Sequence, residues 1–325
     1  MQFVVIVNSF NRRDLLIEAL GSLVNTVDPN LIDYAIVVFE AGSTDGSREW
    51  LAQFATEHRN LKLEIVGPCG RGDSSFAAGV NRACQHALEV FPEVEFLFLY
   101  ETDNWLSSSQ PLIAAMQLLR REPALAAVGF TVRLHSGKPA GWGGSFPTAF
   151  SFVLGPHLSL WLGIPRTDVN MRSSGGLEWF PADAVYTSPL MIKAPVWRSV
   201  GGMDALHFPF SDSDLDWAWK VTRAGYGLAV IPSDAVIHDN LNSLSNWSSM
   251  RVLNFHLARF RLLRKYRGPG VTLAIPALFL RHLAEYSVLA AMVLLGRRPV
   301  LSLKKRSILL KSVWRGYEGA ERPTS

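Results

Sequence analysis

The chain has 325 residues, of which 48% are apolar and 18% are charged, and its formal net charge is +4. This much apolar sequence excludes a disordered or collagen-like chain, and the length fits one large α/β unit or one domain with an appendage. The two cysteines, Cys69 and Cys84, exclude a disulfide framework and match no CxxC metal or redox motif, which favours a reducing, cytoplasmic compartment.

Strand-like and helical segments alternate along the first 134 residues. The expected strands are 3–7, 34–39, 61–66, 95–100 and 126–134, and the expected helices are 15–23, 47–55, 76–90 and 111–121. Such alternation with short connections predicts an α/β fold with a mostly parallel sheet and helices on both faces. Ligands of such sheets bind beyond the carboxyl ends of the strands.

Acidic residues follow two of these expected strands. Glu40 ends the second strand and Asp45 follows it, where carboxylates can accept hydrogen bonds from a nucleobase or ribose, although Asp45 alone also fits a helix cap. Glu101 and Asp103 follow the very apolar run EFLFLY, where two carboxylates are costly to bury unless they are paired or bound to metal. Hard oxygen ligands suit Mg²⁺ or Mn²⁺, which also bind diphosphate oxygens.

The middle of the chain is less regular. Residues 136–178 are rich in Gly, Pro and aromatic residues, which predicts a substrate loop or a surface excursion without a role. Trp142 and Trp179 are candidates for stacking on sugar rings or for simple packing.

Three acids at alternate positions, within SDSDLD at 211–216, open an expected helix. They indicate either a general base held ionised by the helix dipole or a capping cluster. His238 ends a short apolar strand and is either a metal ligand or a structural histidine.

The charge is distributed unevenly, because 15 of the 32 Lys and Arg but only 3 of the 28 Asp and Glu lie in residues 251–325. An acidic body indicates carboxylates gathered for a metal, and a basic, aromatic-rich tail indicates an anionic lipid surface rather than a nucleic acid. The alternative is a tail helix packed on the body with its basic side in solvent. We expect an amphipathic helix at 251–267 and an interfacial or hairpin helix at 271–295.

No membrane span or secretory signal is expected from the sequence. The uncharged apolar runs all fall short of the roughly 18 residues that a span needs. Residues 1–7 lack the basic start and the cleavage site of a secretory signal.

Taken together and in order, these segments resemble the family 2 glycosyltransferases over roughly residues 1–240. The similar segments are VVIVNSFNRRDLL, EAGSTDGS, FAAGVNRACQHA, YETD, SPLMIKAPVWRSVGGMD and SDSDLDWAWKVTRAGYGLAVIPSDAVIHD. The departures from the family pattern are Glu40 and Glu101 in place of Asp, Ala41 in place of Asn, and Ser211 in place of Glu. The resemblance is strongest to bacterial rhamnosyl-, galactofuranosyl- and related transferases of cell-surface polysaccharide and cell-wall synthesis.

The resemblance implies a GT-A nucleotide-diphospho-sugar transferase fold, with a catalytic domain at 1–240 and a helical, membrane-associating region at 241–325. It also implies roles for individual residues. Those at the nucleotide-sugar donor are Ser9, Asn11, Glu40, Asp45, Asn81, Glu101 and Thr102. Those that hold a divalent Mn²⁺ or Mg²⁺ ion are Asp103, His238 and, with them, Glu101. The catalytic base is Asp212 or Asp214, and the acceptor would meet Trp142, Trp179, Ser188 and Gly202.

The implied function is an inverting, metal-dependent transfer of a sugar to a hydroxyl of a glycan or polyprenyl-linked acceptor. The protein would be cytoplasmic and bound peripherally to the inner face of the plasma membrane. Two alternatives stay open: a nucleotidyltransferase on the same fold, and a non-catalytic binding or scaffold protein. No nucleic-acid partner is expected, because the body is acidic and shows no recognition motif.

Overall fold

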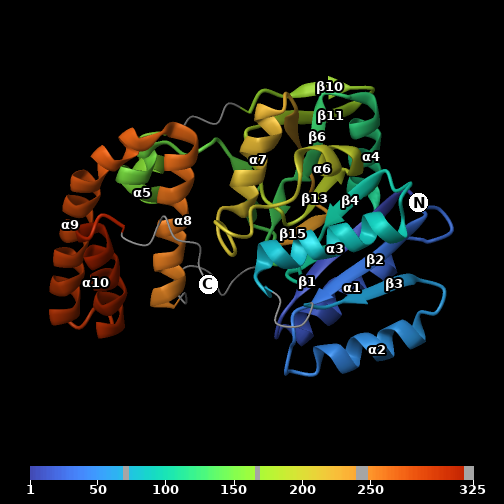
Figure 1. Ribbon diagram of the computed structural model, residues 1–325, viewed down its shortest axis with the longest axis horizontal. Coiled ribbons are helices and arrows are strands. Elements are labelled where there is room, and N and C mark those ends of the chain that lie inside the picture. Colours follow the sequence, from blue (N-terminus) through green and yellow to red (C-terminus); the bar gives the residue numbers. More distant parts are fainter. Residues whose placement is uncertain (69–72, 165–168, 239–247, 318–325) are drawn as a thin grey trace. The chain divides into compact units, whose positions relative to one another are not determined.

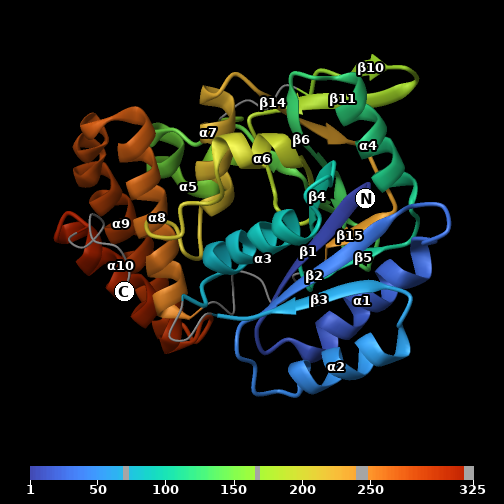
Figure 2. The same cartoon turned by 45° about the vertical axis from the view of Figure 1, so that its right-hand side comes forward.

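The computed structural model describes residues 1–68, 73–164, 169–238 and 248–317 (Figures 1 and 2). The chain groups into two compact units. The first contains Met1–Gly144, Val169–Ala205 and Asp214–Asn240, and the second contains Ser145–Asp168, Leu206–Ser213 and Leu241–Ser325. Cys84 is a buried free thiol, whereas Cys69 lies outside the described residues.

A mixed sheet forms the middle of the first unit, and its nine described strands have the order β10-β11-β14-β6-β13-β4-β1-β2-β3. Only β11 and β13 run against the other seven strands, so the predicted mostly parallel sheet is confirmed. The strands are β1 (Phe3–Ser9), β2 (Tyr34–Glu40), β3 (Lys62–Val66), β4 (Phe96–Leu99), β6 (Leu125–Phe130), β10 (Arg172–Ser174), β11 (Leu177–Ala182), β13 (Leu190–Lys193) and β14 (Gly227–Ile231).

Helices cover both faces of this sheet, as the side-chain alternation of β1 shows. Phe3, Val5 and Val7 lie in one buried apolar cluster with residues of α1, α2 and α4. Neighbouring positions point to the opposite face, where α3 packs (Figure 2). The helices of this unit are α1 (Arg13–Thr26), α2 (Ser47–Glu57), α3 (Phe76–Val90), α4 (Gln110–Arg121), α6 (Ala194–Val200) and, from its second residue on, α7 (Ser213–Arg223).

Two smaller sheets complete the first unit. One has the order β5-β15-β7-β8, and the other pairs β9 with β12. Their strands are β5 (Asn104–Leu106), β15 (Val236–His238), β7 (Val132–Arg133), β8 (Pro139–Gly141), β9 (Gly143–Gly144) and β12 (Ala184–Val185). In the antiparallel pairing of β5 with β15, His238 lies opposite Asn104.

The expected irregular stretch at 136–178 is only partly irregular, because it contains β8, β9, β10, the start of β11 and the helix α5 (Ala149–Trp161). The chain breaks from helical geometry inside α5 at Gly155, whose φ is 76°. Gly and aromatic residues obscure the helical period of this segment, so no helix was expected here.

The second unit is helical, as expected for the C-terminal region. It consists of α5, α8 (Ser249–Arg267), the 3₁₀ turn η2 (Pro269–Ala274), α9 (Ile275–Leu294) and α10 (Val300–Trp314). Its buried core contains Phe152, Phe260, Leu263, Leu278 and Val313.

One helical stretch in the described part of the chain, Pro269–Leu294, is long and apolar enough by length and composition to cross a membrane. Its mean hydropathy is 1.4, and 11% of the apolar window is buried. No span was expected from the sequence because only uncharged apolar runs were considered. This stretch was not among them, since it contains Arg281 and Glu285.

The close packing of α3 on the sheet predicts a large effect of Gly79→Ala. A Cβ at Gly79 would lie 2.6 Å from Cδ1 of Phe39 and 2.9 Å from Nδ2 of Asn8, whereas nothing lies within 4 Å of a Cβ at Gly21 in α1. Urea unfolding should show that Gly79→Ala lowers the free energy of unfolding by about 1–3 kcal/mol. The control, Gly21→Ala, should raise it by about 0.5–1 kcal/mol. Equal unfolding midpoints for the two variants would contradict this packing.

Candidate functional site

The centre of the candidate site is Asp103, in the turn between β4 and β5. The register of β5 and β15 brings His238 beside it, with Nδ1 of His238 3.3 Å from Oδ1 of Asp103. The other carboxylate oxygen, Oδ2, accepts a hydrogen bond of 3.2 Å from Nη1 of Arg12, in the loop after β1. Asp103 is buried. The structure therefore places two of the predicted metal ligands, Asp103 and His238, beside Arg12, a cation that was not predicted to belong to the site.

The charges of this cluster shift each other's protonation. Burial acts to raise the pKa of Asp103, but His238 and Arg12 outweigh burial and lower that pKa below its usual range. Burial acts to lower the pKa of His238, but the Asp103 carboxylate outweighs it, so that pKa is raised. Burial and the neighbouring Asp103 together raise the pKa of Glu101. The cluster therefore favours the ionised form of Asp103 and disfavours the ionised form of Glu101 beside it.

Two buried donor atoms in this cluster fit a divalent cation. Oδ1 of Asp103 and Nδ1 of His238 form no hydrogen bond within the described residues. Two ligands of one cation at about 2.1 Å in adjacent octahedral positions lie roughly 3 Å apart, which is close to their separation. Across the described ranges, no group of three or more His, Cys, Asp or Glu is placed to hold a metal, so the pair supplies at most part of a coordination shell. Carboxylate oxygens suit Mn²⁺ or Mg²⁺, and the imidazole favours the transition metal Mn²⁺ of these two.

Glu101, the third predicted ligand, is engaged elsewhere. Its Oε1 accepts a hydrogen bond of 2.7 Å from Oγ1 of Thr187. The next residue, Ser188, accepts a hydrogen bond of 3.1 Å from Nδ2 of Asn104 through its Oγ. Thr102 is buried within the same turn. Ser188, predicted to meet the acceptor, therefore lies against the acidic turn, and Thr187 was missed because no pattern links it to Glu101.

The loops that follow β1 and β2 are tied together by predicted nucleotide-site residues. Oδ1 of Asn11 accepts a hydrogen bond of 2.7 Å from the backbone N–H of Thr44. Asp45 accepts hydrogen bonds from the backbone N–H groups of Arg13 and Ser47, at 2.9 and 3.1 Å. The hydrogen bond from the Ser47 hydroxyl is the main cause that lowers the pKa of Asp45. Asn11 and Asp45 thus shape this edge of the sheet.

Glu40 closes its own turn. Its two carboxylate oxygens accept hydrogen bonds from the backbone N–H groups of Ser43 (2.6 Å) and Gly42 (3.2 Å). The hydroxyl of Ser9, at the end of β1, is buried and has no hydrogen-bond partner within the described residues. Ser9 therefore has a free polar group at the edge where ligands of α/β sheets bind.

Asn81 of α3 joins two predicted site residues. Its Nδ2 donates to the carbonyl of Met203 and its Oδ1 accepts from the N–H of Met203, both at 2.8 Å. A Cβ at Gly202 would lie 2.3 Å from Oδ1 of Asn81, so this contact requires glycine. Asn81 and Gly202, assigned from the sequence to donor and acceptor, are thus neighbours across 121 residues of chain.

The two predicted stacking tryptophans differ in their surroundings. Trp179 is 5% exposed, belongs to the core cluster and stacks beneath Arg172. Trp142 is half-buried and packs edge-on against Phe180, with ring centroids 5.0 Å apart. The burial of Trp179 favours the packing alternative, whereas Trp142 keeps part of its ring accessible.

The two candidate bases are also held differently. Asp212, in the second unit, has a φ of 60° and a bidentate ion pair with Arg259 of α8, with N–O distances of 2.7 and 2.9 Å. Asp214, in the first unit, accepts a hydrogen bond of 2.9 Å from the backbone N–H of Leu215. Arg259 was missed from the sequence because nothing distinguishes it from the other arginines of the tail.

No protein-family profile matches this chain, and no curated protein matches its sequence. Solved structures do match its fold. The mannosyltransferase PcManGT from Pyrobaculum calidifontis, in complex with GDP-Man and Mn²⁺, has a TM-score of 0.59 at 16% identity, over 98% of this chain and 88% of that one. S. aureus TarS 1-349 has a TM-score of 0.50 at 13% identity, over 97% and 92%.

GalNAc-T7 with UDP, GalNAc and Mn²⁺ has a TM-score of 0.58 at 10% identity, over 97% of this chain and 56% of that one. At such identities the likeness shows the fold alone. This chain has the α/β fold of the GT-A glycosyltransferases, so the predicted fold class is confirmed.

The two hydrogen bonds of Asn81 predict that Asn81→Ala destabilises the chain, because it removes the acceptor of the Met203 N–H and leaves the Met203 carbonyl with the N–H of Ala205 as its remaining donor within the described residues. The free energy of unfolding should fall by about 1–3 kcal/mol in urea titrations. The control is Gln85→Ala on the same helix, whose exposed side chain donates a hydrogen bond to Glu89 and should matter little. An Asn81→Ala variant as stable as the control would show that Asn81 does not hold this loop.

Proposed function

We propose that this protein transfers a sugar from a nucleotide-diphospho-sugar to a hydroxyl group of a glycan acceptor. The observation that carries the proposal is the buried Asp103 with His238 at the carboxyl edge of a sheet with the GT-A fold. Two structures that share this fold, PcManGT and GalNAc-T7, contain Mn²⁺ together with GDP-Man or UDP, which supports the same classes of ligand here.

Asp103 and His238 would hold a divalent ion, and Arg12 would stand beside it. When bound, the ion supplies positive charge for the diphosphate that leaves the sugar. The Arg12 guanidinium adds a fixed positive charge to the same carboxylate, and its half-exposed position leaves it able to meet a phosphate. The loops fixed by Asn11 and Asp45 would hold the nucleoside.

Either Asp212, which precedes α7, or Asp214, in its first turn, would take the proton of the acceptor hydroxyl. The hydroxyl oxygen then forms a bond to the anomeric carbon as the bond to the diphosphate breaks, and a single displacement inverts that carbon. Both Asp212 and Asp214 stay candidates. Arg259 holds both carboxylate oxygens of Asp212 in a bidentate ion pair, which an acceptor hydroxyl would have to share or displace.

The acceptor that we propose is a lipid-linked glycan of cell-surface polysaccharide synthesis, and the sugar a rhamnosyl, galactofuranosyl or related residue. The support for the sugar and the pathway is the sequence resemblance. The support for a lipid-linked acceptor is the basic, apolar second unit, which fits a protein working at the cytoplasmic face of a membrane.

A non-catalytic binding protein of the same fold is the second candidate. It is favoured by the bidentate pairing of Asp212 with Arg259, which resembles a structural ion pair. Such a protein would bind the nucleotide sugar with metal and release no nucleotide, so a nucleotide-release assay separates it from the enzyme.

Metal binding should depend on the buried pair. With GDP or UDP present, calorimetric titration of Mn²⁺ should show affinity falling roughly a hundredfold in Asp103→Asn and in His238→Ala. The matched control is His86→Ala, since His86 lies at the same 3.3 Å from Glu64 but in a pair that is more exposed than Asp103 and His238. Unchanged Mn²⁺ affinity in both Asp103→Asn and His238→Ala would remove the metal role.

Turnover should depend on one of two carboxylates, Asp212, which precedes α7, or Asp214, in the first turn of α7. Replacing the base by Asn should lower the rate of sugar transfer by roughly 10²–10⁴-fold with donor affinity retained. If Asp212→Asn and Arg259→Gln instead lower the thermal midpoint equally and Asp212→Asn keeps its activity, Asp212 is structural and Asp214 is the base. If Asp212→Asn and Asp214→Asn both keep full activity, the proposed mechanism is wrong.

A further inference from the structure

Helix α9 has two faces of opposite character. Leu278 and His282 on one face are buried within the second unit. The other face exposes Leu273 in the preceding turn, then Leu280, Leu283 and Val288. These positions recur at roughly helical spacing, so they form one exposed apolar stripe along the helix.

The stripe ends in an exposed turn. Residues 294–301, here called the tip segment, connect α9 to α10, and the two helices lie side by side in the second unit (Figures 1 and 2). Leu294, Leu295 and Val300 in the tip segment are 89%, 69% and 70% exposed. Arg297 and Arg298 lie between them and are exposed as well. Large apolar side chains gathered in this way indicate an interaction surface.

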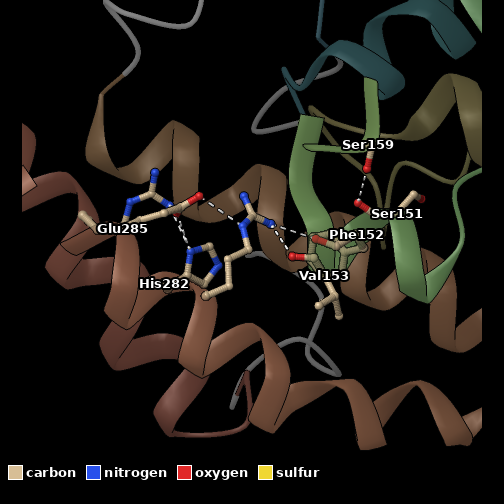
Figure 3. A network of polar contacts seen from close by, with 8 residues as sticks. Ser151, Phe152, Val153, Ser159, His282 and Glu285 are labelled. Carbon is tan, nitrogen blue, oxygen red and sulfur yellow. Dashed lines mark hydrogen bonds and ion pairs between the residues drawn. The ribbon is translucent and has the colours of Figure 1, made fainter. Parts of the chain in front are cut away.

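The inner face of α9 is fixed by a network of half-buried charges around the buried His282 (Figure 3). Arg281 donates hydrogen bonds to the carbonyl oxygens of Phe152 (2.8 Å) and Val153 (3.2 Å). These carbonyls precede the break in α5 at Gly155, and a Cβ there would lie 2.2 Å from the guanidinium of Arg281. The break thus leaves carbonyls without helical partners and makes room for the arginine that satisfies them.

The same network joins α9 to α10. Glu285 forms ion pairs with Arg281 (3.1 Å) and with Arg306 of α10, and Nδ1 of His282 lies 3.3 Å from Glu285. Burial acts to raise the pKa of Glu285, but His282 and the two arginines outweigh it and lower the pKa to about 2. A helix that crossed the bilayer alone would expose these charges to lipid, so the network binds α9 to its neighbours and leaves only the outer face for a membrane.

The charge of the region selects the partner. Residues 286–317 contain seven Lys or Arg and no Asp or Glu. A second copy of this chain would bring the same positive charge against it, whereas an anionic bilayer surface complements it. Apolar side chains next to arginines also suit the boundary between lipid head groups and acyl chains.

We propose that α9 and the tip segment form a docking surface for an anionic lipid bilayer, with α9 lying in the plane of the interface and the tip segment inserted. Binding through this surface would bring the protein to a lipid-linked acceptor in the membrane. The biological role of the surface rests on the proposed function, whereas the binding itself does not. The binding itself is measured without any sugar donor, so its failure would leave the proposed function standing.

The test is co-sedimentation of the full chain with vesicles of phosphatidylcholine containing 30% phosphatidylglycerol, compared with pure phosphatidylcholine. We expect binding to the anionic vesicles that weakens at 0.5 M NaCl. Combined Arg297→Glu and Arg298→Glu should weaken it at least roughly 30-fold, and combined Leu294→Ser, Leu295→Ser and Val300→Ser at least roughly tenfold.

Matched controls lie in the first unit. The pair Arg48→Glu and Arg59→Glu changes the net charge by the same amount on exposed residues, and Leu31→Ser replaces another exposed leucine. Both controls should bind as the parent does. The proposal is overturned if the controls lose binding as much as the tip variants, or if the parent protein binds neither vesicle.

Two further outcomes would also overturn it. Self-association without vesicle binding, measured by analytical ultracentrifugation, would identify a second copy as the occupant. Retention of the chain in cell membranes after alkaline carbonate extraction would show that α9 spans the bilayer instead of lying on it.

Discussion

The candidate site depends on the burial of one carboxylate, Asp103, between an imidazole and a guanidinium. A buried carboxylate is costly unless charges of opposite sign or a metal accompany it. The chain provides His238 through the register of β5 with β15, and it provides Arg12 through the turn that follows β1. Three segments far apart in sequence therefore have to fold correctly before this carboxylate can be buried.

The parallel half of the fold could be predicted because its strands are short apolar runs separated by helices with clear spacing. The expected helix at 76–90 coincides with α3, and the acidic residues do lie at strand ends. Strand β13 could not be predicted as a central antiparallel strand, because its apolar residues would suit a buried strand in either direction. Helix α5 could not be predicted, because its glycine and aromatic residues obscure the helical period and its helical geometry breaks at Gly155.

The residue types of the site could be predicted, but many of their partners could not. Asp103 and His238 were expected to meet, and they do. Three of the contacts at the site join residues that are 47 to 122 positions apart in the chain. They are Glu101 with Thr187, Asn81 with Met203, and Asp212 with Arg259. Such pairs follow from the tertiary fold, and no local pattern in the sequence predicts them.

The second unit combines two features that are usually kept apart in soluble domains. A network of half-buried charges around Glu285 joins its helices, and its surface exposes large apolar residues on α9 and the tip segment. Charged groups inside and apolar groups outside are what a helical element needs when one of its faces meets lipid and its other face must stay with the protein. The net positive charge of the unit gives this arrangement a preferred partner.

The most direct test of the account is anomalous scattering from crystals grown with Mn²⁺ and a nucleoside diphosphate. We expect an Mn²⁺ peak within about 2.3 Å of both Asp103 Oδ1 and His238 Nδ1, with diphosphate oxygens completing the shell. An ion bound away from both residues, with the Asp103–His238 pair unchanged, would contradict it.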